Sequence, residues 1–355
     1  MAGGKPPDTM PPMPRDSVRR WGKFGVALGG SVVFSILFVR SIDIDDVRQA
    51  LTAANYVYVL PALALFALSL VARSLRWQLM YRPNRDLSWR LLLPSLLVGY
   101  AGNNLLPLRA GELLRAQHIA GRTNPPVPWM VTFGTFLMER LFDFMVLATF
   151  VLWGILIVHE GGAYRDLAVL IAGGTAFGLL VAIFLARKPR LPGRLLARNW
   201  PLLTERVRSR GAELSFSFIE GFSCLASPAR FLLVAAATAL AWGLELGMYF
   251  VISRAFALDA GFIKIAFAGA AANVAMSVPS AQGGVGPFQY VALEALAKAG
   301  VTGGGAAAFA LALHIFLVGP VSLVGLGFLW RSTVPLGEDV AAAELPGPEV
   351  ATGAG

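Results

Sequence analysis

The chain is poor in the residue types that build catalytic and metal sites. Its 355 residues include one cysteine and three histidines, and charged residues make up only 14%. The single Cys224 excludes a disulfide within the chain. His118, His159 and His314 are far apart and lack metal-ligand spacing, so neither a metal site nor a cofactor is expected. No G-x-x-x-x-G-K-[ST] sequence occurs, which excludes a Walker-type ATP site.

Apolar residues are present in large excess. Hydrophobic residues reach 56%, and the mean hydropathy of +0.64 is a value that few water-soluble proteins have. The formal charge of +9 is compatible with nucleic-acid binding. However, the lysines and arginines lie in patches between apolar runs, which is typical of multi-pass membrane proteins. We therefore predict an all-α polytopic membrane protein that does not bind nucleic acid.

Six apolar runs are long enough for a helix to cross a bilayer, which takes about 20 residues. They are residues 21–39, 56–71, 128–158, 167–186, 231–252 and 306–330. The first run follows basic residues but lacks a cleavage site, so it is predicted to be an uncleaved span. Two further apolar stretches, 91–106 and 262–278, are interrupted by polar and helix-breaking residues.

Clustered arginines set the expected orientation, because basic connections stay in the cytoplasm. Those after the second run are Arg73, Arg76, Arg82, Arg85 and Arg90. A second basic connection covers about 187–229, and it forms either an amphipathic helix on the anionic inner leaflet or a helical linker. The pattern predicts a transmembrane domain over residues 21–331 of an inner or plasma membrane. Residues 1–20 and 332–355 are predicted to be disordered cytoplasmic ends.

The two interrupted stretches resemble each other. "NNLLPLRAGE" has Pro107 and then Gly111, and "NVAMSVPSAQGG" has Pro279 and then Gly283 at the same spacing. Each is followed by a short helix-compatible segment. The flanking charges predict two re-entrant helical hairpins that enter from opposite faces. They are either an inverted repeat, as in many transporters, or two unrelated loops with ordinary turn residues.

Polar residues at these breaks have two interpretations. Backbone that leaves a helix inside a bilayer needs partners, and the amides of Asn103, Asn104 and Asn273 can supply them. Arg109 and Glu112 either form a local pair at the membrane surface or take part in a site.

Other charges lie inside apolar helices. "FLMERLFDFMV" carries Glu139, Arg140 and Asp143, and Glu245 lies between two glycines in "AWGLELGMY". A charge at a helix centre costs about 2.5 to 3.5 kcal/mol on insertion scales, so these side chains should face the protein interior and find partners. Glu245 either serves a site or only joins two helices, and the glycines around it favour close helix packing.

These residues favour a lipid phosphate as the ligand, because arginine binds phosphate through two parallel hydrogen bonds and stays charged when buried. The predicted phosphate-binding residues are Arg109, Arg140, Asn103, Asn104 and the turn glycines Gly283, Gly284 and Gly286. The acids expected to balance charge or relay protons are Glu112, Glu139, Asp143 and Glu245.

Three motifs carry a resemblance to a known family. "GYAGNNLLPLRAGELLR", "MERLFDF" and "PSAQGGVGPFQ", in this order, resemble the flippase-like UPF0104 family, which includes the transmembrane region of lysylphosphatidylglycerol synthases. The family-motif positions are Pro107, Gly111, Pro279 and Gln289. The resemblance implies movement of a lipid across the bilayer, and no aminoacyl transfer is expected here. Relatives often have an acid at the position of Gln289; if that acid carries coupling protons, this protein uses another carboxylate or is not proton-coupled.

Three functions remain open from the sequence. The first is binding and translocation of an anionic or polyprenyl-phosphate lipid. The second is an accessory role, presenting lipid to an envelope enzyme or glycosyltransferase. The third is a membrane-embedded lipid-modifying enzyme with Glu139 or Asp143 as a base. The first is preferred, and no catalytic residue is assigned.

Overall fold

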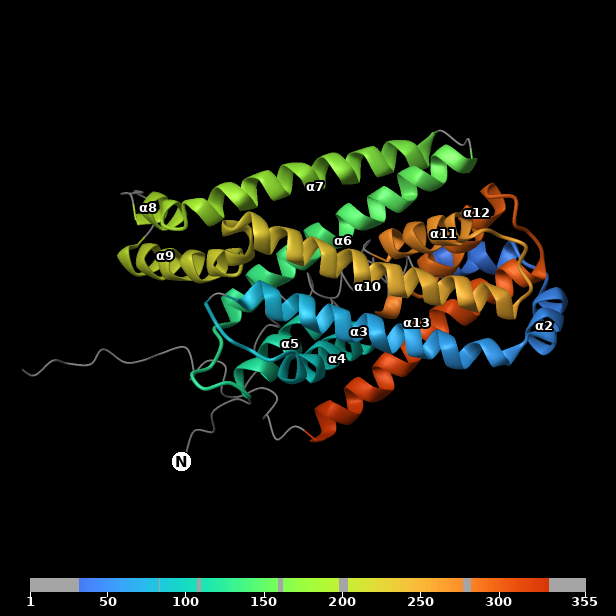
Figure 1. Cartoon of the computed structure of the whole chain (residues 1–355), viewed down its shortest axis with the longest axis horizontal. Coiled ribbons are helices and arrows are strands. Elements are labelled where there is room, and N and C mark those ends of the chain that lie inside the picture. Colours follow the sequence, from blue (N-terminus) through green and yellow to red (C-terminus); the bar gives the residue numbers. More distant parts are fainter. Residues whose placement is uncertain are drawn as a thin grey trace, which may run out of the picture.

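The computed structural model describes residues 32–82, 84–106, 110–158, 162–197, 204–276 and 282–331. Within these ranges the regular elements are all helices and no strand is present. Figure 1 shows the long helices running beside one another along the long axis of the molecule. The all-α class is therefore confirmed for the described part of the chain.

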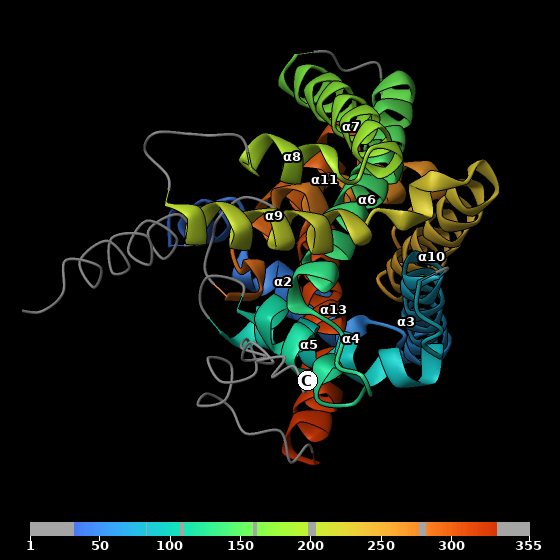
Figure 2. The ribbon, with the colours of Figure 1, turned by 90° about the vertical axis from the view of Figure 1, so that its left-hand side faces the viewer.

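Five long helices form the body of the protein. They are α3 (Val59–Tyr81), α6 (Trp129–Val158), α7 (Ala163–Arg187), α10 (Pro228–Ala255) and α13 (Gly304–Arg331). The short 3₁₀ helix η1 (Tyr56–Tyr58) leads into α3. Helix α3 packs along α10, and α6 packs along α7. Seen from one end, α3 and α10 occupy one side of the bundle (Figure 2).

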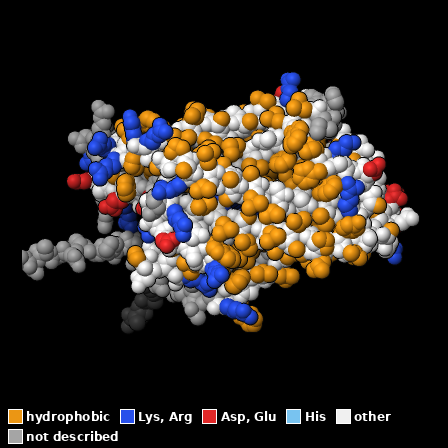
Figure 3. Space-filling model, viewed as in Figure 1, with side chains coloured by type: hydrophobic (Ala, Val, Ile, Leu, Met, Phe, Trp, Pro, Cys, Tyr) orange, Lys and Arg blue, Asp and Glu red, His pale blue; other side chains and the backbone are white. Residues whose placement is uncertain are grey.

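Four helices of the described part are long and apolar enough to cross a membrane. They are Tyr56–Tyr81, Arg165–Arg187, Pro228–Ala255 and Gly304–Arg331, and they coincide with four of the six predicted spans. A fifth predicted span is the 30-residue helix α6, which carries three charged residues within its apolar sequence. The remaining predicted span, residues 21–39, begins outside the described residues. Its described part lies in a helical segment that covers residues 32–40. Hydrophobic side chains cover the middle of the visible surface, and charged side chains gather toward its ends (Figure 3).

Two pairs of shorter helices correspond to the interrupted stretches. Helix α4 (Trp89–Leu105) packs against α5 (Gly111–Ala120), and α11 (Phe262–Ala275) packs against α12 (Pro287–Lys298). The helices predicted to follow the two glycine breaks are thus confirmed. In Figure 1 the first pair lies nearer the end that carries α8 and α9, and the second nearer the end that carries α2. Entry of the two pairs from opposite membrane faces stays a prediction.

The two pairs meet at their inner ends. Gly283 lies in η4 (Gln282–Gly284) with a φ of 69°. A Cβ atom added there would be 3.5 Å from the carbonyl oxygen of Asn104 at the end of α4. The Asn104 side chain donates from Nδ2 to Ser322 Oγ on α13, at 3.1 Å. Pro107, Arg109 and Pro279 lie outside the described residues.

Shorter elements complete the two ends of the bundle. Helix α2 (Ile44–Ala53) contacts α13, whereas α8 (Leu191–Ala197) and α9 (Glu205–Glu220) pack against each other within the basic connection. The 3₁₀ helix η3 (Ser223–Ala226) then leads to α10. The ends predicted to be disordered, 1–20 and 332–355, lie outside the described residues.

One prediction about α3 is wrong. The helix continues ten residues beyond the predicted end of the run at residue 71, so Arg73 and Arg76 are not in a cytoplasmic connection. Both are buried inside the bundle, and Arg76 is fully inaccessible. The helix continues because its next turns carry Leu75, Trp77 and Met80, and buried acids on other helices neutralise the two arginines.

Candidate functional site

A cluster of ion pairs lies at the centre of the protein. Arg76 of α3 binds two carboxylates of α6: Nη1 is 2.5 Å from Asp143 Oδ1, and Nη2 is 3.1 Å from Glu139 Oε1. The two acids are four residues apart and therefore share one face of α6. This confirms that Glu139 and Asp143 face the interior and find partners there.

The cluster continues from α3 to α10 and α11. Arg73 Nη2 is 2.7 Å from Glu245 Oε2. Tyr249 donates its hydroxyl proton to Glu245 Oε1 at 2.8 Å, and Asn273 Nδ2 donates to the Tyr249 oxygen at 2.8 Å. Trp242 Nε1 donates to Asp143 Oδ1 at 2.9 Å. The sequence thus predicted the burial of Glu245 correctly and missed its partner, Arg73.

The glycines beside Glu245 do not make room for an unusually close approach of another helix. A Cβ atom added at Gly243 would meet nothing within 4 Å, and one at Gly247 would meet only a leucine side chain at 3.9 Å. The expectation of close packing at this pair is therefore wrong. The ion pair with Arg73, rather than small residues, joins this part of α10 to α3.

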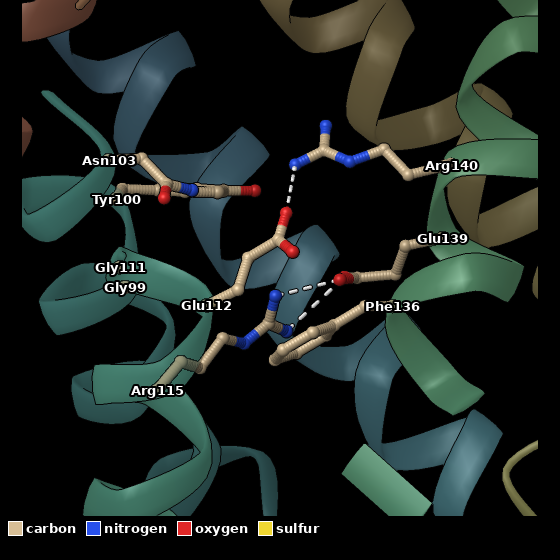
Figure 4. Close-up of a pocket in the computed structure, with 9 residues that line it drawn as sticks. All are labelled: Gly99, Tyr100, Asn103, Gly111, Glu112, Arg115, Phe136, Glu139 and Arg140. Carbon is tan, nitrogen blue, oxygen red and sulfur yellow. Dashed lines mark hydrogen bonds and ion pairs between the residues drawn. The ribbon is translucent and has the colours of Figure 1, made fainter. Parts of the chain in front are cut away.

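Helix α5 completes the cluster through Arg115. Its guanidinium makes two contacts to Glu139, Nη1 to Oε2 at 2.7 Å and Nη2 to Oε1 at 3.3 Å. The same group lies 3.5 Å from the ring centre of Trp77 and 4.7 Å from that of Phe136. Figure 4 shows Arg115 reaching from α5 to Glu139 on α6, with Phe136 beside it.

We call these six paired side chains the ion-pair network. Its members are Arg73, Arg76, Arg115, Glu139, Asp143 and Glu245. Three positive and three negative charges cancel, which is a requirement for burying ions away from water. Asp143 lies 14 residues after the start of α6 and 15 before its end. At 1.5 Å per residue this is about 21 Å from either end, so the network lies near the middle of the apolar helix.

A pocket adjoins the network between α4, α5 and α6. Its cavity is small, about 10 Å³, which is room for about one water molecule, and it is open to the outside. We call it the Arg140 pocket, and it is lined by Gly99, Tyr100, Asn103, Gly111, Glu112, Arg115, Phe136, Glu139 and Arg140. Arg140 Nη2 lies 3.5 Å from Glu112 Oε1, and the two side chains are 43% and 30% exposed. Figure 4 shows this pair crossing the space between α5 and α6.

The wall of the pocket depends on a close approach of backbones. A Cβ atom added to Gly111 would come within 2.0 Å of the Gly99 carbonyl oxygen, so only glycine fits between α5 and α4. Asn103 lies on the same wall, and its Oδ1 atom is buried without a hydrogen-bond donor among the described residues. The pocket wall therefore offers a free acceptor beside the Arg140–Glu112 pair.

The glycine-rich turn before α12 is held by a different set of contacts. Gly286 donates its N–H to Gln289 Oε1 at 2.8 Å. Gln289 Nε2 lies 2.6 Å from His314 Nδ1, and His314 Nε2 lies 2.7 Å from the Gly283 carbonyl oxygen. The amide thus donates to Nδ1, and the ring donates from Nε2 to the carbonyl. Gln289 fastens the turn to α13, and a phosphate that took the Gly286 N–H would have to displace it.

The predicted site residues fall into three groups. Arg140, Glu112 and Asn103 line the pocket together with Glu139, whereas Asp143 and Glu245 lie deeper in the ion-pair network. A separate group lies at the contact of the two helix pairs, and it consists of Asn104, Gly283, Gly284, Gly286 and Gln289. Their roles toward a lipid stay predictions.

Three arginines were missed as site residues: Arg73, Arg76 and Arg115. Ser69, Arg73 and Arg76 have spacings of four and three residues, which place them on one helical face of an apolar segment. All three are buried. This spacing is the signal that would have identified them.

Comparison with known proteins places the chain in a family. The model of the "Lysylphosphatidylglycerol synthase TM region" family matches residues 23–325. The chain belongs to this family. A relative from Methanothermobacter thermautotrophicus, named "UPF0104 membrane protein", is 28% identical over 321 residues, which cover 83% of this chain and 91% of the relative. The family and the four apolar helices together identify a membrane protein.

A second relative is larger than this chain. "Glycosyltransferase AglD" of Haloferax volcanii is 28% identical over 154 residues, which are 42% of this chain and 24% of that protein. The similarity therefore concerns about a quarter of AglD. No solved structure matches the chain.

Proposed function

We propose that this member of the lysylphosphatidylglycerol synthase transmembrane family binds a phosphate-bearing lipid through Arg140 and moves it between leaflets. The observation that carries the proposal is the exposed pairing of Arg140. The three arginines of the ion-pair network are buried, and each has a carboxylate partner within 2.7 Å. Arg140 has one ion-pair partner in the part of the chain that the structure describes, Glu112 at 3.5 Å, and it lines the open pocket.

In such a pair, another anion can easily replace the Glu112 carboxylate. An exposed ion pair contributes about 0 to 1 kcal/mol, whereas a phosphate can accept two parallel hydrogen bonds from one guanidinium. Phosphate bound to Arg140 would also lie at the depth of the ion-pair network, one residue along α6 from Glu139. The head group would then be partway across the apolar helix rather than at its end.

The arrangement of the helix pairs supports passage between leaflets. They occupy opposite halves of the long axis and meet beside α13, as expected for opposed hairpins that flank a central site. The orientation we propose has both termini in the cytoplasm of an inner or plasma membrane, since the basic connection with α8 and α9 lies at one end. Since no Walker motif occurs, lipid movement would be downhill, ion-coupled or driven by a partner.

A leaflet-exchange assay tests the proposal. Purified protein is reconstituted in liposomes with fluorescent phosphatidylglycerol or a polyprenyl phosphate, and a membrane-impermeant reductant bleaches the outer leaflet. A hydrogen bond to a charged group contributes about 1.5 to 3 kcal/mol, so Arg140→Ala should slow the exchange at least about tenfold. Arg165→Ala is the matched control, because Arg165 is exposed and its one ion pair with a described residue is with its neighbour Asp166. Equal rates in wild type, both variants and protein-free liposomes would refute the proposal.

A second candidate function follows from the larger relative. The name of AglD describes a glycosyltransferase, and the similarity to this chain covers part of that protein. The chain would then present a lipid phosphate to a separate glycosyltransferase. Under this alternative Arg140→Ala loses lipid binding, but wild-type protein shows no leaflet exchange and co-purifies with the enzyme. A chemically altered lipid formed by the purified chain alone would favour the lipid-modifying enzyme instead.

A further inference from the structure

We propose that Glu112 is a built-in competitor for the phosphate site, and that a phosphate binds Arg140 only as Glu112 takes up a proton. The inference rests on the proposed function and adds to it the coupling of lipid binding to one proton. The ligand chemistry is a phosphodiester, carried either by a lipid or by a soluble molecule.

Glu112 differs from the other three buried or half-buried acids of the site in how it is held. Glu139 binds both Arg76 and Arg115, with contacts of 3.1 and 2.7 Å. Asp143 binds Arg76 and accepts from an indole N–H, and Glu245 binds Arg73 and accepts from a tyrosine hydroxyl. Among the described residues, Glu112 has a single ion-pair partner, Arg140 at 3.5 Å, so it alone can exchange that partner without breaking the ion-pair network.

The charges around Glu112 make the exchange competitive. Facing it across the pocket are Arg140 and Glu139 of α6, Arg115 on its own helix and Tyr100 of α4. Arg115 is engaged by Glu139, so Arg140 is the one described cation left for Glu112 in the pocket. A phosphate on Arg140 would put two anions, the phosphate and the Glu112 carboxylate, beside one guanidinium. Like charges beside the same guanidinium repel each other.

The backbone of α5 is held on both sides of Glu112, so the helix cannot carry this residue away from Arg140. Helix α5 is fixed one residue earlier, where Gly111 lies against the backbone of α4. It is fixed again one turn later by the two contacts between Arg115 and Glu139. The carboxylate therefore relieves the repulsion by taking up one proton from the bulk solution through the open side of the pocket, one for each phosphate bound. Its new O–H is a donor, and Asn103 Oδ1 is an acceptor without a donor on the same wall.

The test measures binding of a fluorescent short-chain phosphatidylglycerol to detergent-solubilised full-length protein between about pH 5 and pH 8. A phosphodiester keeps one negative charge over this range, so any pH dependence belongs to the protein. Uptake of one proton on binding makes the affinity rise as pH falls, with log Kd changing by up to about one per pH unit. Glu112→Gln removes the competitor and should bind on the order of tenfold more tightly at pH 8, with little pH dependence. Glu220→Gln is the matched control, because Glu220 is a half-buried acid that pairs with Arg85 away from the pocket.

The outcomes separate this inference from the proposed function. A slope of log Kd against pH near zero in wild type, or an equal slope in wild type and Glu112→Gln, would overturn proton coupling. If Arg140→Ala still loses binding in that case, the proposed function stands. Absence of binding in wild type would refute both. Because the wild-type slope needs no substitution, the inference is tested even if a variant fails to fold. Glycerophosphoglycerol, tested in parallel, distinguishes the source: binding as tight as that of the lipid, with the same slope, would support the exchange and identify a soluble phosphodiester as the ligand.

Discussion

The ion-pair network can be tested by removing one charge and then restoring neutrality. Arg73→Met keeps most of the side-chain volume and leaves Glu245, among the described residues, with the Tyr249 hydroxyl as its hydrogen-bond partner. Removing one partner of a buried pair costs about 3 to 5 kcal/mol, because the other charge stays buried and uncompensated. At about 2 to 4 °C per kcal/mol, the melting temperature should fall by roughly 6 to 20 °C.

The double variant Arg73→Met/Glu245→Gln restores neutrality, and the new amide oxygen can still accept from Tyr249. We expect it to recover at least half of the loss. The matched control is Arg82→Met, since Arg82 and Asp86 form an exposed pair, 52% and 85% accessible, that contributes at most about 1 kcal/mol. Thermal unfolding of purified protein measures all three. A loss in Arg73→Met no larger than in Arg82→Met, or a double variant less stable than the single one, would refute the reasoning.

Three further outcomes are expected. Burial raises the pKa of the Cys224 thiol to about 12, so almost no thiolate is present near neutral pH, and a maleimide dye should label the folded protein on the order of 100-fold more slowly than the unfolded one. Equal labelling rates would contradict this. Gly111→Ala should force α5 away from α4 and cost about 1 to 3 kcal/mol, while Gly173→Ala, in open space, should not destabilise; melting temperatures compare the two. Gln289→Leu removes the hydrogen bonds of the Gln289 side chain to the Gly286 N–H and to His314, leaves the bond from His314 to the Gly283 carbonyl, and should lower the melting temperature by an amount equivalent to about 1 to 3 kcal/mol; an unchanged value would mean that the Gln289 side chain does not hold the turn.

The elements of the fold were predictable where the sequence pattern is local. Apolar runs located the four helices that are long enough to cross a membrane, and proline and glycine located the breaks before α5 and α12. The end of α3 was not predictable by the same rule, because arginine normally marks a cytoplasmic connection. Arg73 and Arg76 stay inside the helix only because acids more than 60 residues away in sequence neutralise them. Such long-range pairing leaves no trace in a hydropathy profile.

The same limit applies to the candidate site. Burial of Glu139, Asp143 and Glu245 followed from the cost of placing charges in apolar helices. The ion-pair partners of these acids could not be predicted in the same way, because any buried cation, or a ligand, can offset the cost of burying them. Arg140 was expected to lie inward beside its neighbours, yet it is half exposed and pairs with Glu112 rather than with Glu139. Helix packing decides which of these two acids Arg140 binds, and the sequence alone does not predict the choice.

The ion-pair network explains why Arg140 remains accessible. Glu139 precedes Arg140 in sequence, and both side chains line the pocket between α5 and α6. Arg76 and Arg115 hold Glu139 from two sides, so its charge is already neutralised. Apolar residues of similar volume would often be at least as stable as buried ion pairs, so stability alone does not account for these charges. Under the proposed function these charges act on the pocket: they fix α5 against α6 and leave Arg140 with one described ion-pair partner, Glu112, which a phosphate would replace.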